Sequence, residues 1–148
     1  MQERRAENQG ITVYQMRQKL LSIGDDFWIE DNHGNRCFKV NGKAVRVRDT
    51  MEIENAGGSN AATVKKAMIS PLRERWHVEV AGGSDIKVQG NIVDHEYTLE
   101  ANGDKVAEVS KRWLRVADTY GVEVQPGQNA ALVLAIVAVV DSMAHPDR

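Results

Sequence analysis

The chain has 148 residues, of which 42% are hydrophobic and 27% are charged, a composition typical of one soluble globular domain. Its 19 Lys and Arg residues against 21 Asp and Glu residues give a net charge of −2, so no overall basic excess favours binding to nucleic acid or to an anionic membrane. The single cysteine, Cys37, excludes an internal disulfide and a zinc site built on a cysteine pair within this sequence.

Residues 1–12 are mostly polar and charged, and we expect a flexible N-terminal tail there. A secretory signal would need an apolar stretch, which this segment lacks. The longest apolar run, 130–140, is shorter than the roughly 20 residues of a membrane-spanning helix. We therefore expect a cytoplasmic protein without a transmembrane segment, whose single domain covers residues 13–144 and is followed by a short tail, 145–148.

Residues 14–124 alternate between apolar and charged side chains, and a period of two predicts strands with one buried face and one solvated face. The alternation is clearest in 45–48, 51–54, 76–80, 86–88, 97–100 and 122–124. The segments 31–35, 55–60, 82–85 and 101–104 are rich in Asn and Gly, the composition of tight hairpin turns. The sequence therefore predicts an antiparallel sheet of consecutive hairpins.

The end of the chain predicts a helix instead. Asn129 follows a Pro-Gly break and is suited to cap a helix that begins at the next residue. Residues 130–140 are apolar on every side, so this element must be surrounded by protein. A buried central strand has a similar composition, but the length of the run and its alanines favour a helix. A barrel of strands around this helix would sheath it along its whole length.

Several segments, in order along the chain, carry a family resemblance: 16–20, 24–29, 38–44, 48–53, 69–73, 90–97, 109–113 and 118–122, followed by the apolar run. Over residues 14–143 the sequence resembles the LOR family, which is similar to the Tubby C-terminal domain. The resemblance implies an all-β fold, an antiparallel barrel that encloses a hydrophobic C-terminal helix.

One departure from that family concerns the number of hairpins. Family members have about six hairpin units, whereas this chain provides about five, or about ten strands, because residues 43–49 fuse two units. The barrel is therefore expected to be smaller, gapped, or completed by a second copy of the chain. Tubby domains resemble membrane tethers that bind phosphoinositides, and phospholipid scramblases look like distant relatives of the family. The resemblance implies no reaction common to the family.

Two clusters of cations are the strongest candidates for a binding site. The first flanks residues 67–72 and the second follows residue 110; together they comprise Lys65, Lys66, Arg73, Arg75, Lys111, Arg112 and Arg115. If both clusters lie at one end of the barrel, they form a site for lipid headgroups or other phosphates. The alternative is that outward strand positions are charged for solubility, with Glu74 and Glu79 offsetting the cations.

Other residue types give weaker indications of chemistry. On a strand, His95 would point away from Asp94 and Glu96, so these three cannot converge on a metal, and a surface strand or turn with His95 bonded to a neighbour is expected. Cys37 stands beside Phe38, which favours a buried, inert thiol. The sequence contains no P-loop, dinucleotide fingerprint or zinc-protease motif.

These observations predict a non-enzymatic binding or tethering module without a cofactor or metal. The expected partner is an anionic lipid headgroup or a membrane surface, to which the protein would bind peripherally, and a homo-oligomer is the second expected assembly. No nucleic acid is expected. The alternative function is that of a protein–protein interaction scaffold, and an enzyme ranks last.

Overall fold

The computed structural model describes residues 2–5, 12–17, 26–30, 33–41, 50–70, 73–111 and 119–144. Eleven strands and one helix lie within these residues. The strands are β1 Gln2–Arg5, β2 Thr12–Arg17, β3 Asp26–Glu30, β4 Arg36–Asn41, β5 Thr50–Asn55, β6 Asn60–Ser70, β7 Arg73–Val80, β8 Ile86–Asn91, β9 Glu96–Ala101, β10 Asp104–Ser110 and β11 Thr119–Val124. The helix α1, Ala130–Ala144, follows the last strand.

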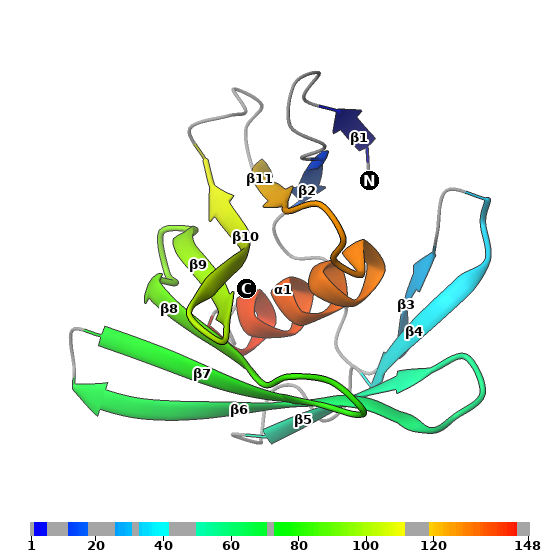
Figure 1. Cartoon of the computed structure of the whole chain (residues 1–148), viewed down its shortest axis with the longest axis horizontal. Coiled ribbons are helices and arrows are strands. Elements are labelled where there is room, and N and C mark those ends of the chain that lie inside the picture. Colours follow the sequence, from blue (N-terminus) through cyan, green and yellow to red (C-terminus); the bar gives the residue numbers. More distant parts are fainter. Residues whose placement is uncertain are drawn as a thin grey trace.

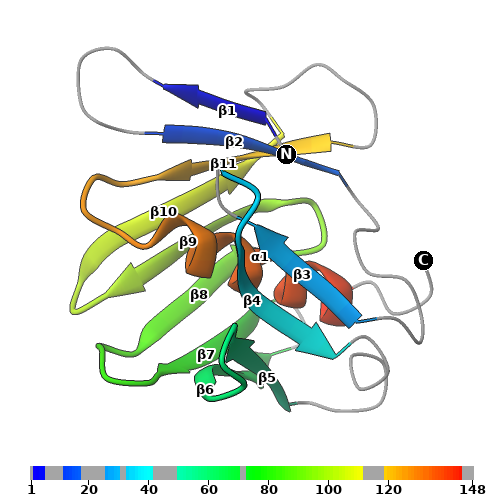
Figure 2. The ribbon, with the colours of Figure 1, turned by 90° about the vertical axis from the view of Figure 1, so that its right-hand side faces the viewer.

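All eleven strands belong to one antiparallel sheet with the order β1-β2-β11-β10-β9-β8-β7-β6-β5-β4-β3. Strands from β3 to β11 pair with their sequence neighbours, and β11 then pairs with β2, which joins the two ends of the chain. The sheet curls around α1 (Figure 1). Figure 2 shows β3 and β4 crossing in front of the helix on the opposite side from β8 and β9. The predicted antiparallel fold around a C-terminal helix is thus confirmed.

The sheet forms a half-barrel rather than a closed one. The edge strands are β1 and β3, and no pairing joins them among the strands that the structure describes. The gapped form was one of the three outcomes expected from the short hairpin count. The described residues hold eleven strands, against an expected ten, because β1 adds one. Residues 43–49, the suggested fused unit, lie outside the described residues.

The strand β1 differs from the predicted N-terminal tail. Residues Gln2–Arg5 pair in register with 12–15 of β2. A polar segment can add to a sheet edge in this way because backbone groups supply the pairing, and no alternating apolar pattern is needed. The composition of residues 1–12 therefore did not reveal the strand.

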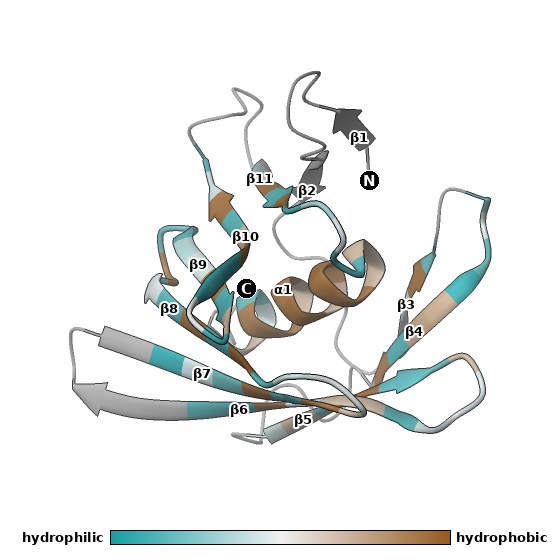
Figure 3. Cartoon of the chain, in the orientation of Figure 1, coloured by the Kyte–Doolittle hydropathy of each residue, from teal (hydrophilic) through white to brown (hydrophobic). Residues whose placement is uncertain are grey.

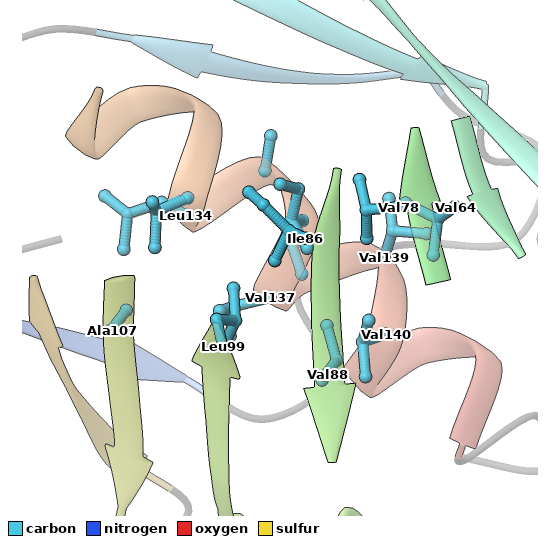
Figure 4. Close-up of a cluster of buried hydrophobic side chains, with 14 of the residues drawn as sticks. Val64, Val78, Ile86, Val88, Leu99, Ala107, Leu134, Val137, Val139 and Val140 are labelled. Atoms are coloured by element: carbon cyan, nitrogen blue, oxygen red, sulfur yellow. The ribbon is translucent and has the colours of Figure 1, made fainter. Parts of the chain in front are cut away.

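The helix α1 forms the centre of the core, as predicted. Asn129 caps it: its Oδ1 accepts a hydrogen bond from the backbone N–H of Leu132 at 3.2 Å. Residues 133–141 are all buried, so no face of the helix in this stretch meets solvent. Figure 3 shows the hydrophobic helix against the polar hairpin turns. The core packs side chains of β6 to β10 against the helix (Figure 4), namely Val64, Val78, Ile86, Val88, Leu99 and Ala107 against Leu134, Val137, Val139 and Val140.

The predicted hairpin turns are present wherever the structure describes them. Between β9 and β10, Asn102 and Gly103 both have positive φ, 55° and 83°, the backbone conformation of a two-residue hairpin turn. Among the described residues, no helix is long and apolar enough to cross a membrane.

Candidate functional site

The antiparallel register brings the start of β7 and the end of β10 to the same end of the sheet. Gly90 of β8 pairs with Glu74 of β7 and with Tyr97 of β9, and Tyr97 pairs with Val109 of β10. We use the name rim for the end of the sheet that lies just beyond this row of paired residues. The rim consists of Arg73, residues 91–96, Ser110 and Lys111. Three strand spacings separate β7 from β10, about 14 Å in a flat sheet.

Glu96 fixes the part of the rim that carries Lys111. Its Oε1 accepts a hydrogen bond from Ser110 Oγ at 2.9 Å and another from the Lys111 backbone N–H at 3.2 Å. Ser110 is fully buried, whereas Lys111 is exposed. The carboxylate thus orders the backbone from which residues 112–118 continue, and it also offsets one positive charge. Arg112 and Arg115 lie outside the described residues.

The first predicted cation cluster does not converge on one face. Lys65 and Lys66 are adjacent in β6, so their side chains point to opposite sides of the sheet. Lys65 lies on the outer face, where its Nζ is 2.8 Å from Glu79 Oε1. The hydrogen bond from Lys65, and then its charge, lowers the pKa of the Glu79 carboxyl below its usual value. Lys66 shares the inner face with Trp76, and its Nζ lies 5.4 Å from the centroid of that ring.

The two arginines of the first cluster lie on β7. Arg75 precedes the buried Trp76 in the strand, so its side chain lies on the outer face, the same face as Lys65. Arg75 is half-buried there. The backbone of Arg73 lies at the rim, at the same end of the sheet as Lys111. Of the seven predicted residues, Arg73 and Lys111 are thus the ones that the described backbone brings to one end, whereas Lys65 and Lys66 are separated by the sheet.

A buried His–Asp pair behind the rim was missed by the sequence analysis. His95 Nε2 lies 2.6 Å from Asp141 Oδ1, and both side chains are at most 2% exposed. The ring of His95 also stacks on Tyr120, with 4.3 Å between ring centroids. The predicted turn at His95 is correct, but its surface position is wrong: the residue adopts φ 56°, and the turn directs the ring under the sheet toward α1.

Hydrogen bonds of the β8–β9 turn fix this arrangement. Asn91 Oδ1 accepts the backbone N–H of Asp94 at 3.1 Å, and Asn91 Nδ2 donates to Asp94 Oδ2 at 2.9 Å. The backbone N–H of His95 donates to the Ile92 carbonyl at 3.2 Å. The His95–Asp141 bond then joins this turn to the last turns of the helix, 46 residues later in the chain. Rim and helix are therefore one connected unit.

Tyr97 completes the buried polar group. Burial, and then the negative charge of Asp141, raise the pKa of its phenol well above the usual value. Its Oη has no hydrogen-bond partner among the described residues. One sequence signal could have marked Asp141 but was not used: this residue directly follows an apolar run, and a carboxylate there needs a buried partner, which the sequence does not identify. Because neither His95 nor Asp141 reaches solvent, the pair is positioned to hold the fold rather than to meet a substrate.

Metal binding has no support in the described part of the chain. There, no group of three or more His, Cys, Asp or Glu side chains is arranged to hold an ion. Cys37 is half-buried in β4, less buried than expected, and its Sγ lies 3.5 Å from the Asn35 carbonyl.

Comparison with known proteins identifies the family. Residues 12–84 and 49–141 match the profile of the family described as LURP-one-related, LOR. A relative from Bacillus subtilis, the uncharacterized protein YxjI, is 22% identical over 152 aligned positions, which cover 89% of this chain and 93% of the relative.

A solved structure of a protein from Arabidopsis thaliana also matches. It covers 87% of this chain and 91% of its own, with a TM-score of 0.47 and 18% identity.

Proposed function

The chain belongs to the LURP-one-related family, and we propose that it is a non-enzymatic binding or tethering module whose rim binds phosphate groups, foremost those of anionic phospholipids. One observation supports this proposal above the others. The antiparallel register brings the start of β7, with Arg73, to the same end of the sheet as Lys111 at the end of β10. Lys111 opens the segment that contains Arg112 and Arg115.

The expected interaction is weak and depends on salt. Each Lys or Arg near an anionic membrane surface contributes about 1 kcal/mol. Lys111, Arg112 and Arg115 together would therefore contribute about 3 kcal/mol, which is roughly a 150-fold change in affinity. Glu96 lies beside Lys111 and lowers this value. Because exposed charges are screened within about 8–10 Å at physiological salt, binding should decrease steeply as salt is added.

Vesicle flotation tests the proposal directly. The wild-type chain should float with vesicles that contain phosphatidylserine and not with phosphatidylcholine alone. Replacing Lys111, Arg112 and Arg115 together with Ala should abolish flotation. The matched control replaces Lys65, Lys87 and Lys105 with Ala: these are also exposed lysines, but their positions along the strands are away from the rim, and the change of net charge is the same. Wild-type protein that fails to float at low salt, or equal losses in both variants, would refute a phosphate-binding rim.

A protein–protein interaction scaffold is the second candidate, and the open sheet supports it. Among the described strands, β1 and β3 each pair on one side only. Unpaired strand edges are places where another chain can add a strand. Sedimentation equilibrium at micromolar concentration distinguishes the outcomes: a concentration-dependent dimer supports edge pairing, whereas a monomer of 16.5 kDa at all concentrations contradicts self-association.

A further inference from the structure

A second cationic feature lies on the edge hairpin of β3 and β4, far from the rim in the strand order. Trp28 of β3 pairs with Lys39 of β4, so their side chains share one face. The inner face of this hairpin carries Ile29, Phe38 and Val40, all buried in the core. Trp28 and Lys39 therefore lie on the outer face, where both are half-buried. Figure 1 shows the hairpin at the edge of the half-barrel, where β4 pairs with β5 and β3 is the edge strand.

Two cations contact the indole of Trp28. The guanidinium carbon of Arg36 lies 4.9 Å from the ring centroid, and Lys39 Nζ lies 5.9 Å from it. Both distances fall within the range of a cation–π contact. The irregular pairing at Ile29 and Glu30 places Arg36 opposite Glu30, which brings the arginine, exposed at the start of β4, close enough to reach the ring.

We propose that Trp28, Arg36 and Lys39 form a membrane-contact site in which the indole enters the headgroup layer of an anionic bilayer and the two cations bind lipid phosphates. Tryptophan favours this layer because its ring has an apolar body and one polar N–H. Arg and Lys can keep their charge at the phosphates while their alkyl stems lie along apolar surface. The site rests on the proposed function because it needs the same membrane, but it uses a different surface.

The surroundings favour a membrane over a nucleic acid. Glu30 of β3 lies in register with Arg36, and Glu54 of β5 lies in register with Lys39, so each of these cations has a carboxylate at a paired position on a neighbouring strand. A strand of nucleic acid needs a positively charged groove with successive aromatic rings, and the described part of this hairpin offers one tryptophan on its outer face. Insertion of a single indole, assisted by two cations, fits a bilayer surface better.

Quenching of tryptophan fluorescence by lipids with brominated acyl chains tests the site. The chain has Trp28, Trp76 and Trp113, of which Trp76 is fully buried. Trp28→Phe should remove most of the quenching seen with phosphatidylserine vesicles, whereas Trp113→Phe, in the segment after the rim, should keep it. Glycerol phosphate, which supplies the phosphate without a bilayer, should not change the emission of Trp28.

A charge variant covers the case in which Trp28→Phe does not fold. Arg36→Gln with Lys39→Gln should weaken vesicle binding about 25-fold, about fivefold for each cation. Lys87→Gln with Lys105→Gln, which removes the same charge elsewhere, should leave binding within about twofold.

The outcomes separate the two proposals. Quenching that persists in Trp28→Phe and vanishes in Trp113→Phe overturns the hairpin site and supports the rim. Vesicle binding that survives the triple rim variant and is lost in the hairpin variant supports the hairpin site and refutes the rim. No binding by wild-type protein, or binding of a single-stranded oligonucleotide through Trp28 in place of vesicles, overturns the hairpin site.

Discussion

Breaking the His95–Asp141 pair should destabilise the protein more than the loss of any exposed ion pair. His95→Asn retains a residue that tolerates the positive φ of 56° at this position, but removes the ring that reaches Asp141. Asp141→Ala removes the carboxylate and keeps a strong helix former in α1. Each change leaves a buried polar group without its main partner.

The magnitude follows from burial. Both side chains are at most 2% exposed, so neither can exchange its partner for water. Removing one member of such a pair typically costs about 3–5 kcal/mol, a large part of a total stability of about 5–15 kcal/mol. For a chain of this size, that corresponds to a decrease in Tm of roughly 6–20 °C. The exposed pair of Lys65 and Glu79 should contribute much less, because solvent screens both charges.

A double-mutant cycle in urea isolates the interaction. Because the first substitution already breaks the bond, the second should cost less than it does alone, and the double variant should lose about 1–3 kcal/mol less than the sum of the singles. Additive losses, to within about 0.5 kcal/mol, would refute the idea that the pair acts as a unit between the β8–β9 turn and the helix.

Three further substitutions test the core. Val137→Asp should abolish folding, since an unpaired charge would be buried in α1; a soluble variant with a cooperative melt would argue against an enclosed helix. Gly90→Ala should lower Tm, because φ is +137° and a Cβ would lie 2.8 Å from the Glu96 carbonyl oxygen; an unchanged Tm would contradict this close approach. Tyr97→Phe should leave stability at pH 7 nearly unchanged, as its buried Oη has no partner among the described residues. The folded state raises the pKa of Tyr97, so the folded protein resists ionisation of this phenol, whereas the unfolded chain ionises it at about pH 10. The stability of the wild-type protein should therefore be unaffected below about pH 10 and fall above it. Tyr97→Phe, which cannot ionise, should move base-induced unfolding to higher pH.

Much of the fold was predictable because it depends on local patterns. Alternation identified the strands β5, β7, β8, β9 and β11, and Asn129 with the apolar residues after it marked the start of α1. The strand β1 was not predictable in this way, since it pairs through its backbone and its residues 2–5 are polar. The His95–Asp141 pair depends on how the helix end meets a turn 46 residues earlier, a long-range contact that no local pattern encodes.

The cation clusters show the same limit. Their charge was evident from the sequence, but the direction of each side chain depends on strand register. Lys65 and Lys66 were grouped because they are adjacent, and adjacency in a strand places them on opposite faces. Arg73 and Lys111 are 38 positions apart in the chain, and the hairpins β7–β8 and β9–β10 return them to one end of the sheet. Trp28 and its two cations became visible only through the pairing of β3 with β4.

The most direct test of the proposed rim is to map the bound phosphate on the folded chain by amide NMR. Bilayer discs containing phosphatidylserine would be titrated into labelled wild-type protein, with phosphatidylcholine discs as the control. The Lys111 amide is a sensitive reporter because it donates to the Glu96 carboxylate. Shifts at Arg73, Glu96 and Lys111 that disappear in the triple rim variant are the predicted result. Shifts that instead concentrate at the opposite end of these strands, around Gly82 and Asn102, with the rim unchanged, would contradict it.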